Sequence, residues 1–294
     1  MPLDGVSQPP ERWSIIASRG TAALDGRRVP VYHGAMRFTA HDDDRDSVVG
    51  RALLILEVFG RGGGREMRLS AIASSAGLPK ATTYRLIQIL VGRKFLDRTG
   101  PYYRPGLRLF ELGSLTTERR RLAERAMPFM TDLFEATHET VHLAVRDGFD
   151  LVYVEKLRGH RVGSVPTATG ARMPLHCTAL GKTLLAGEPD DLLEATIENG
   201  LKPLTSNTLT TGDHLREAVA TARAQGVAFD REEAVLGLSC VSAPVVDADR
   251  RVTAALSVSI GVHRMVRIQD LAPLVVAAAQ GVSEQLGAPR IINR

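Results

Sequence analysis

The sequence predicts a two-domain protein of the mixed α/β (α+β) class, with a helical N-terminal domain and a C-terminal domain of antiparallel strands and helices. Residues 69–90 carry two short apolar stripes at helical spacing, and strand-like alternation begins after Thr140. A chain of 294 residues is also long enough for two domains. The predicted segments are an N-terminal extension at 1–46, a first domain at 47–106, a linker helix at 107–127 and a second domain at 128–290.

The extension differs from the rest of the chain because it shows no sustained hydrophobic periodicity. It contains consecutive prolines and ends in the acidic run 42–46, so we expect it to be mostly disordered. Met36 lies just before the first clear helical pattern, which begins at Val48. We therefore hypothesise that Met36 is the natural start. An intact mass of the native protein that matches a start at Met1 would reject this hypothesis.

A helix, a turn and a second helix are predicted between Leu69 and Leu90. We expect Ser70 to cap the first helix, because a serine hydroxyl accepts from a backbone N–H of the first turn. Gly77 should end that helix, since glycine enters the left-handed conformation without a Cβ clash. Pro79 then suits the first turn of the second helix, where its missing N–H does no harm.

The second helix is expected to bury Leu86, Ile89 and Leu90 and to expose a polar face near its start. Arginine and lysine suit contacts with guanine, threonine with bases or phosphates, and tyrosine with phosphates. This layout is typical of a helix-turn-helix DNA reader. The alternative is an ordinary amphipathic helical hairpin with a solvated polar face. The residues of this segment predicted to contact DNA are Ser70, Lys80, Ala81, Thr82, Thr83, Tyr84 and Arg85.

Residues 95–104 alternate apolar and polar side chains around a Thr-Gly-Pro turn, which predicts a β-hairpin, the wing of a winged helix-turn-helix. Segment 47–104 holds ten basic residues against three acidic ones, which concentrates positive charge where phosphates would lie. The alternative is a basic surface that serves only solubility. The wing residues expected to reach DNA are Arg98 and Arg104, together with one of the two tyrosines, Tyr103 or Tyr102.

A long helical pattern with an apolar stripe follows from Leu107 to Thr137. Pro128 should kink or break it, because proline removes one helical hydrogen bond and clashes with the preceding turn. An apolar stripe on a helix that leaves the first domain suits dimerisation. Packing of the stripe on its own domain is an equally weighted alternative.

The remaining elements belong to the second domain. A hairpin turn is expected at Asp147-Gly148, between two alternating segments. Helices are expected at 176–186, 213–225 and 269–286.

A second hairpin is predicted from two alternating segments joined by the four-residue loop 247–250. Pairing across this loop places Cys240 opposite Ser257 and Leu238 opposite Ser259, so that the two serines lie beside the thiol on one face. Two hydroxyls and a thiol together could bind a small carboxylate. From spacing alone, the favoured alternative is the polar, solvent-facing side of an amphipathic strand.

Motifs of enzymes and metal sites are weak in this sequence. The segment Gly181-Lys182-Thr183 is similar to the end of a phosphate-binding loop, but His176 stands where that motif needs glycine. Cys240 could be a nucleophile with His176 as its base only if the fold brought them together. His138, His142 and His176 match no strong metal-ligand spacing. We therefore predict no catalytic residue, no cofactor and no metal.

The sequence holds no apolar run long enough to cross a membrane and no signal-peptide pattern, which predicts a cytoplasmic protein without a membrane partner. Its two cysteines, Cys177 and Cys240, argue against a disulfide framework.

The chain from about Ser47 to Leu286 resembles the IclR (isocitrate lyase regulator) family of bacterial transcription factors. Four motifs and the strand ALSVSI, specific as an ordered set, carry the resemblance. The motifs are RALLILEVF (51–59), LSAIASSAGLPKATTYRLIQIL (69–90), GARMPLHCTALGKTLLA (170–186) and FDREEAVLGLSCVSAPV (229–245).

This resemblance implies a winged helix-turn-helix joined by a helix to a GAF-like effector domain. It also implies homodimers, often paired into tetramers, that bind palindromic operators in double-stranded DNA and respond to a small organic or aromatic acid. Gly170 and Ala171 would then offer backbone N–H groups to an anion. The effector residues so implied are Gly170, Ala171, Asp230, Leu238, Cys240, Ser257 and Ser259. The resemblance reverses the preference for a solvent-facing strand, and the competing interpretation is an enzyme or metal sensor built on a GAF-like domain.

Overall fold

The structure is a computed structural model that describes residues 20–24, 27–31, 47–61, 66–159, 167–263 and 267–289. Within the N-terminal extension it describes only β1 (Gly20–Leu24) and β2 (Arg27–Val31), which pair antiparallel. The rest of the extension, with the proposed start at Met36, lies outside the described residues. The expected disorder of this segment therefore stays a prediction.

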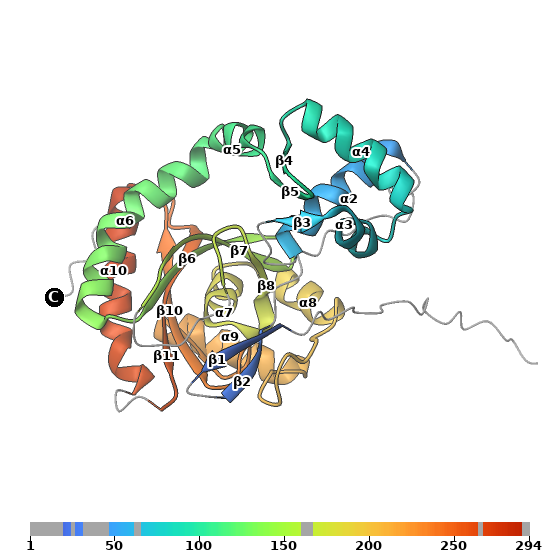
Figure 1. The fold of residues 1–294 in the computed structure, drawn as a ribbon. Helices are drawn as coiled ribbons and strands as arrows, with labels where there is room; N and C mark the ends of the chain where they lie inside the picture. Colours follow the sequence, from blue (N-terminus) through green and yellow to red (C-terminus); the bar gives the residue numbers. More distant parts are fainter. Residues whose placement is uncertain are drawn as a thin grey trace, which may run out of the picture.

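The N-terminal domain is the predicted winged helix-turn-helix, drawn in blue to teal in Figure 1. Three helices pack around a small core, and the strands form a sheet in the order β3-β5-β4. Ile55, Ile72, Ile87 and Leu96 are almost fully buried in this core. The elements are α2 (Val48–Arg61), β3 (Met67–Arg68), α3 (Leu69–Ala76), α4 (Lys80–Gly92), β4 (Leu96–Thr99) and β5 (Tyr102–Pro105).

The turn between α3 and α4 confirms the expected glycine stop. Gly77 has φ of 65°, and the N–H of Leu78 donates to the carbonyl of Ala73 at 3.0 Å. The expected cap at Ser70 is wrong, because α3 begins directly after β3 and Arg68 occupies the N-cap. Pro79 is the N-cap of α4 rather than part of its first turn.

The buried stripe of α4 differs from the predicted one. Ile89 is 55% exposed, whereas Ile87 and Thr83 are fully buried. Because the helix faces the core with positions 83, 86, 87 and 90, its stripe follows the i, i+3, i+4, i+7 pattern from Thr83. A buried threonine was not distinguishable from an exposed one in the sequence, and this residue sets the rotation of the helix.

The linker consists of α5 (Leu107–Ser114) and α6 (Thr117–Thr137), with the break at residues 115–116. The sequence predicted a kink or a break at Pro128, and no break occurs there, because α6 continues through this residue. The predicted boundary between residues 127 and 128 therefore falls inside one helix. From Leu122 onward, the apolar stripe of α6 is buried against the C-terminal domain, which compensates for the hydrogen bond that Pro128 removes.

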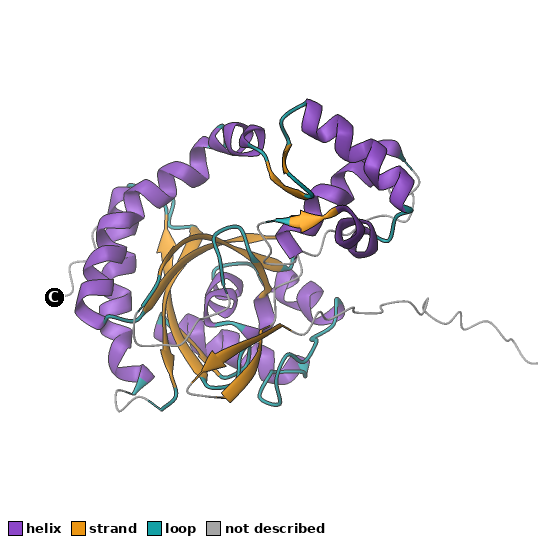
Figure 2. Ribbon diagram, in the orientation of Figure 1, coloured by secondary structure: helices purple, strands orange, loops and turns teal. Residues whose placement is uncertain are grey.

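The C-terminal domain contains a six-stranded antiparallel sheet in the order β8-β7-β6-β11-β10-β9, as the sequence predicted in class. The strands are β6 (Thr140–Asp147), β7 (Asp150–Leu157), β8 (Arg172–Pro174), β9 (Ala228–Arg231), β10 (Leu238–Val246) and β11 (Val252–Gly261). The sheet is strongly curled, as Figure 2 shows in orange. It therefore has a convex and a concave face, each with its own core.

Helices cover both faces of the sheet (Figure 1). The convex face packs against α6 and α10 (Ala272–Gln285), and the concave face curls around α7 (Ala179–Ala186). Helices α8 (Asp190–Glu198) and α9 (Gly212–Gln225) complete the concave side. No helix in the described part of the chain is long and apolar enough to cross a membrane.

Three expected elements of this domain are displaced. The helix predicted at 176–186 is a 3₁₀ turn, η1 (Leu175–Cys177), followed by α7, because the Thr178 hydroxyl accepts from the N–H of Gly181 and caps a new helix. The last helix likewise starts as the 3₁₀ turn η2 (Ile268–Leu271) before α10. The β6–β7 turn consists of residues 148–149, because the residues on either side pair with each other.

The register of the β10–β11 hairpin is two residues from the predicted one. Cys240 lies opposite Ser259, and Ser242 lies opposite Ser257. A bulge at the end of β10 and a loop closed by Asp247, which accepts from two backbone N–H groups, cause the offset. Because side chains alternate with a period of two, an even shift leaves each side chain on its predicted face.

Candidate functional site

The start of α4 presents most of the residues predicted to contact DNA. Lys80, Ala81, Tyr84 and Arg85 are exposed, and Thr82 is half-buried. They belong to the first two turns of the helix, so they share one end of it. This end of α4 can offer an ammonium, a guanidinium and a phenol to a negatively charged surface.

Ser70 on α3 is also exposed, as are the wing residues Arg98 and Arg104. The Nε of Arg98 donates to the Gly100 carbonyl at 3.0 Å, which holds this guanidinium at the tip of the wing. Arg104 lies 3.7 Å from the carboxylate of Asp97, a solvent-exposed pair that contributes little to stability.

Two residues of the predicted DNA surface are not on the surface. Thr83 is fully buried, and its hydroxyl donates to the Pro79 carbonyl at 3.0 Å. Tyr103 is 3% exposed, so its expected phosphate contact is also wrong. The sequence missed Arg68, whose guanidinium donates to the Tyr102 hydroxyl at 3.1 Å and lies over that ring. Arg68 lies beside Tyr102 because it belongs to the two-residue strand β3, which the sequence did not predict.

The concave face of the C-terminal sheet carries two adjacent rows of polar side chains. Directly paired residues share a face, so the strand register defines both rows. The first row is Thr140, Ser259, Cys240 and Asp230, and the second is Lys156, His142, Ser257 and Ser242. We call these eight residues the polar patch. All are buried except Cys240 and Lys156, which are half-buried, so the solvent-facing interpretation of the serines is wrong.

A chain of contacts runs through the polar patch. The Cys240 thiol lies 3.1 Å from the Ser259 hydroxyl, which lies 3.5 Å from Nδ1 of His142. Nε2 of His142 lies 2.7 Å from the hydroxyl of Thr167, which accepts from Nζ of Lys156 at 2.9 Å. Five side chains from separate segments are thus in one hydrogen-bonded series.

Burial favours the neutral form of several groups in the patch. It lowers the pKa of His142 to about 3, with help from the charge of Lys156, so the imidazole is neutral. Burial, with the nearby charge of Glu233, raises the pKa of Asp230 to about 7. Burial also raises the pKa of Cys240 well above its usual value. The patch therefore offers neutral donors and acceptors together with the ammonium of Lys156, which suits recognition of a small polar molecule.

The remaining predicted effector residues lie around the concave side. Leu238 is buried on the same face as Cys240. Contrary to expectation, the backbone N–H groups of Gly170 and Ala171 are not free for an anion, because they donate to the carbonyls of Tyr153 and Ala168. The loop before β8 therefore satisfies its own backbone, and the predicted anion contact there is wrong for this structure.

A buried ion pair was missed in the sequence. Lys182 of α7 donates to both oxygens of Glu233, at 2.6 and 2.7 Å, and both side chains are less than a tenth exposed. The backbone N–H of Glu233 in turn donates to Asp230 at 2.7 Å. No local pattern connects two residues so distant in sequence. The pair also shows that Gly181-Lys182-Thr183 lies inside a buried helix rather than in a phosphate loop.

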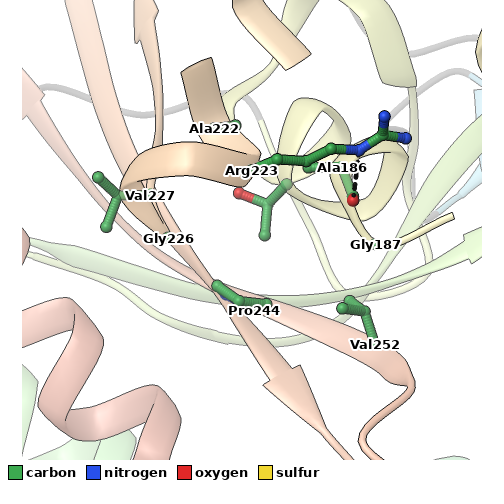
Figure 3. A pocket seen from close by; sticks show the side chains of 9 residues that line it. Ala186, Gly187, Ala222, Arg223, Gly226, Val227, Pro244 and Val252 are labelled. Carbon is green, nitrogen blue, oxygen red and sulfur yellow. Dashed lines mark hydrogen bonds between the residues drawn. The ribbon is translucent and has the colours of Figure 1, made fainter. Parts of the chain in front are cut away.

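Two of the cavities formed by the described residues lie outside the polar patch. The larger, about 170 Å³, lies between the ends of α7 and α9 and the sheet (Figure 3). Arg223 at its rim donates to the Ala186 carbonyl at 2.9 Å. The second, about 20 Å³, is lined partly by His176, which contacts the Lys202 carbonyl. Among the described residues, no three histidine, cysteine or acidic side chains converge as a metal site would require.

Comparison with known families assigns both domains. Residues 48–100 match the "IclR helix-turn-helix domain", and residues 114–284 match "Bacterial transcriptional regulator IclR C-terminal". The curated relatives include the HTH-type transcriptional regulator XynR of Escherichia coli, 32% identical over 82% of this chain and 97% of that protein. They also include the transcriptional repressor IclR of Escherichia coli, 30% identical over 82% of this chain and 90% of that protein.

Solved structures agree with this assignment. An IclR homologue from Microbacterium hydrocarbonoxydans, complexed with 4-hydroxybenzoate, superposes with a TM-score of 0.75 at 25% identity, covering 82% of this chain and 99% of the other. The IclR protein of Thermotoga maritima gives 0.66 at 30% identity, covering 81% and 98%. The chain is a DNA-binding regulatory protein and not an enzyme, and it belongs to the IclR family of bacterial transcriptional regulators.

Proposed function

We propose that this protein binds a palindromic operator as a homodimer or tetramer, and that a small organic or aromatic acid bound at the polar patch changes its operator affinity. The observation that carries the effector part is the patch itself. Convergent polar side chains within an otherwise apolar interior are the usual composition of a small-molecule site. Relatives that are named repressors favour repression as the outcome.

The DNA part of the proposal rests on the exposed start of α4 and on the wing. Lys80, Tyr84 and Arg85 would enter the major groove, with Arg85 positioned to read guanine. Arg98 and Arg104 would contact the backbone beside it. The exposed Ser70 and Ala81 would lie against the same stretch of DNA.

Exposed apolar residues support self-association of the N-terminal half. Val48 and Val49 of α2 are 65% and 69% exposed, and Phe110 and Leu115 of the linker are 73% and 71% exposed. Exposed apolar side chains that form a contiguous patch mark contact sites between proteins. A two-fold dimer that covers them would present two recognition helices, which is what a palindromic operator requires.

The relative that holds 4-hydroxybenzoate supports the effector class. Such an acid carries a carboxylate and a hydroxyl, and the patch offers hydroxyls, an imidazole and a carboxyl to them. Asp230 would accept from an effector hydroxyl rather than face a carboxylate.

Binding to the DNA upstream of the protein's own gene tests the proposal directly. Fluorescence anisotropy across a salt series should give specific, salt-sensitive binding, because phosphate contacts release counterions. A panel of small carboxylic and aromatic acids should contain one that alters this affinity, with a coupling of about 5- to 150-fold. Specific binding that no acid alters would reject the effector part alone.

Truncation of the two serines should separate the two activities. We expect Ser257→Ala/Ser259→Ala to remove the response to the effector and to leave operator binding unchanged, because both hydroxyls lie in the patch. Thr253→Ala on the same strand is the control, since this side chain is exposed and outside the patch. A normal response of the double variant in the same anisotropy assay would show that the effector binds elsewhere.

A further inference from the structure

We infer that Lys156 determines the specificity of the proposed effector site, by pairing its ammonium with the effector's carboxylate. The site would then take small carboxylates that carry a second oxygen function, such as hydroxy acids, and reject their uncharged amides. This inference rests on the proposed effector function and adds the residue that selects the ligand's charge.

The strand register places Lys156 in the patch. It lies directly opposite His142, which lies directly opposite Ser257 on the other side. Paired residues share a face, so the ammonium belongs to the same concave row as the serine. Lys156 is half-buried whereas the other two are buried, so it forms the outer end of that row.

Hydrogen bonds fix the position of the ammonium. Nζ of Lys156 donates to the carbonyl and to the hydroxyl of Thr167, at 2.6 and 2.9 Å. The same hydroxyl contacts His142, which continues the contacts to Ser259. An ammonium whose position is fixed by hydrogen bonds is pre-organised to receive an anion, because little side-chain freedom remains to be lost on binding.

The charges around the row favour an anionic ligand. Burial and the charge of Arg158 lower the pKa of Lys156 to about 8, so a carboxylate beside it would restore the stability of the charged form. Lys182, the ammonium of the adjoining helix, is already engaged by both oxygens of Glu233. Lys156 lies at the half-buried end of the row, so of these two cations it is the one that a ligand carboxylate could reach.

The inner end of the row provides for the second oxygen. The Ser242 hydroxyl is fully buried and has no hydrogen-bond partner in the described part of the chain. It lies opposite Ser257, in the same row as Lys156. Buried hydroxyls are nearly always hydrogen-bonded, so this one marks a position where a ligand oxygen would be accommodated.

The test compares acids with their amides. The probes are 4-hydroxybenzoate and 4-hydroxyphenylacetate, whose two oxygen functions lie at opposite ends of the molecule, each paired with its amide. Binding is measured by titration calorimetry and by operator release. We expect at least one acid to bind and its amide not to bind. Lys156→Met should weaken that acid by about 10- to 100-fold, the range for losing a charge-assisted hydrogen bond. Lys156→Arg should retain the preference for the acid.

Controls make the outcomes distinguishable. Lys202→Met removes another half-buried lysine that lies outside the patch, and it should leave acid binding unchanged. Operator affinity without acid, measured for every variant, reports whether the fold is intact. An acid that binds Lys156→Met as tightly as the unaltered protein, or an amide that binds as well as its acid, would overturn the inference and leave the effector function standing. No binding of any acid would overturn both.

Discussion

Replacing Glu233 with alanine should lower the free energy of unfolding by about 3–5 kcal/mol, the cost of leaving a buried charge uncompensated. Lys182 donates to both oxygens of Glu233, and its side chain is only 3% exposed. Without that carboxylate, the ammonium of α7 would be buried in the concave core. Urea denaturation followed by circular dichroism measures the change.

Two further variants test whether the loss of stability comes from the buried charge of Lys182. Glu188→Ala removes the carboxylate from a half-buried pair with Arg146, and it should cost clearly less than Glu233→Ala, because water can solvate the arginine that remains. The double replacement Lys182→Met/Glu233→Leu removes both charges and should recover most of the loss, because the desolvation cost disappears as well. A loss of stability in Glu233→Ala no larger than in Glu188→Ala would contradict the buried pair.

Arg85→Ala should weaken operator binding by about 1–3 kcal/mol, or roughly 5- to 150-fold, the range for one well-placed contact with a base. Arg85 is exposed on the first turns of α4, beside Lys80 and Tyr84. Anisotropy with a labelled operator fragment measures the loss. Arg93→Ala is the matched control, since this arginine is also exposed but caps the opposite end of the helix. Equal effects of the two variants would reject α4 as the recognition helix.

Glycine and periodicity made the N-terminal domain predictable. Gly77 must take a positive φ between two helices, and the wing alternates around Gly100, so both appear in the sequence as local signals. Thr83 was misplaced because a threonine suits both a buried and an exposed position. Its burial depends on how α4 rotates against α2 and α3, which only the packed core decides.

The effector face was predictable for a different reason. Ser257 and Ser259 alternate with apolar neighbours, which predicts the face of the sheet that they share. A register error of two residues does not change that face. Lys156 and His142 were missed because their position beside the serines depends on pairing between β7, β6 and β11. The backbone bonds of Gly170 depend on β7 in the same way. Contacts between distant segments leave no local pattern in a single sequence.

The continuity of α6 has a mechanical consequence. Its 21 residues give a rigid rod of about 31 Å, at a rise of ~1.5 Å per residue. One part of this rod is clamped on the convex face of the sheet, and the other leads to the DNA-binding half. If α6 tilted by about 5° about its C-terminal end, its N-terminal end would move by ~3 Å, because the helix is about 31 Å long. That displacement approaches the ~3.4 Å rise of one base pair along a strand. Because α6 has no break along its length, a tilt of its packed part would reach the DNA-binding half without being absorbed within the helix.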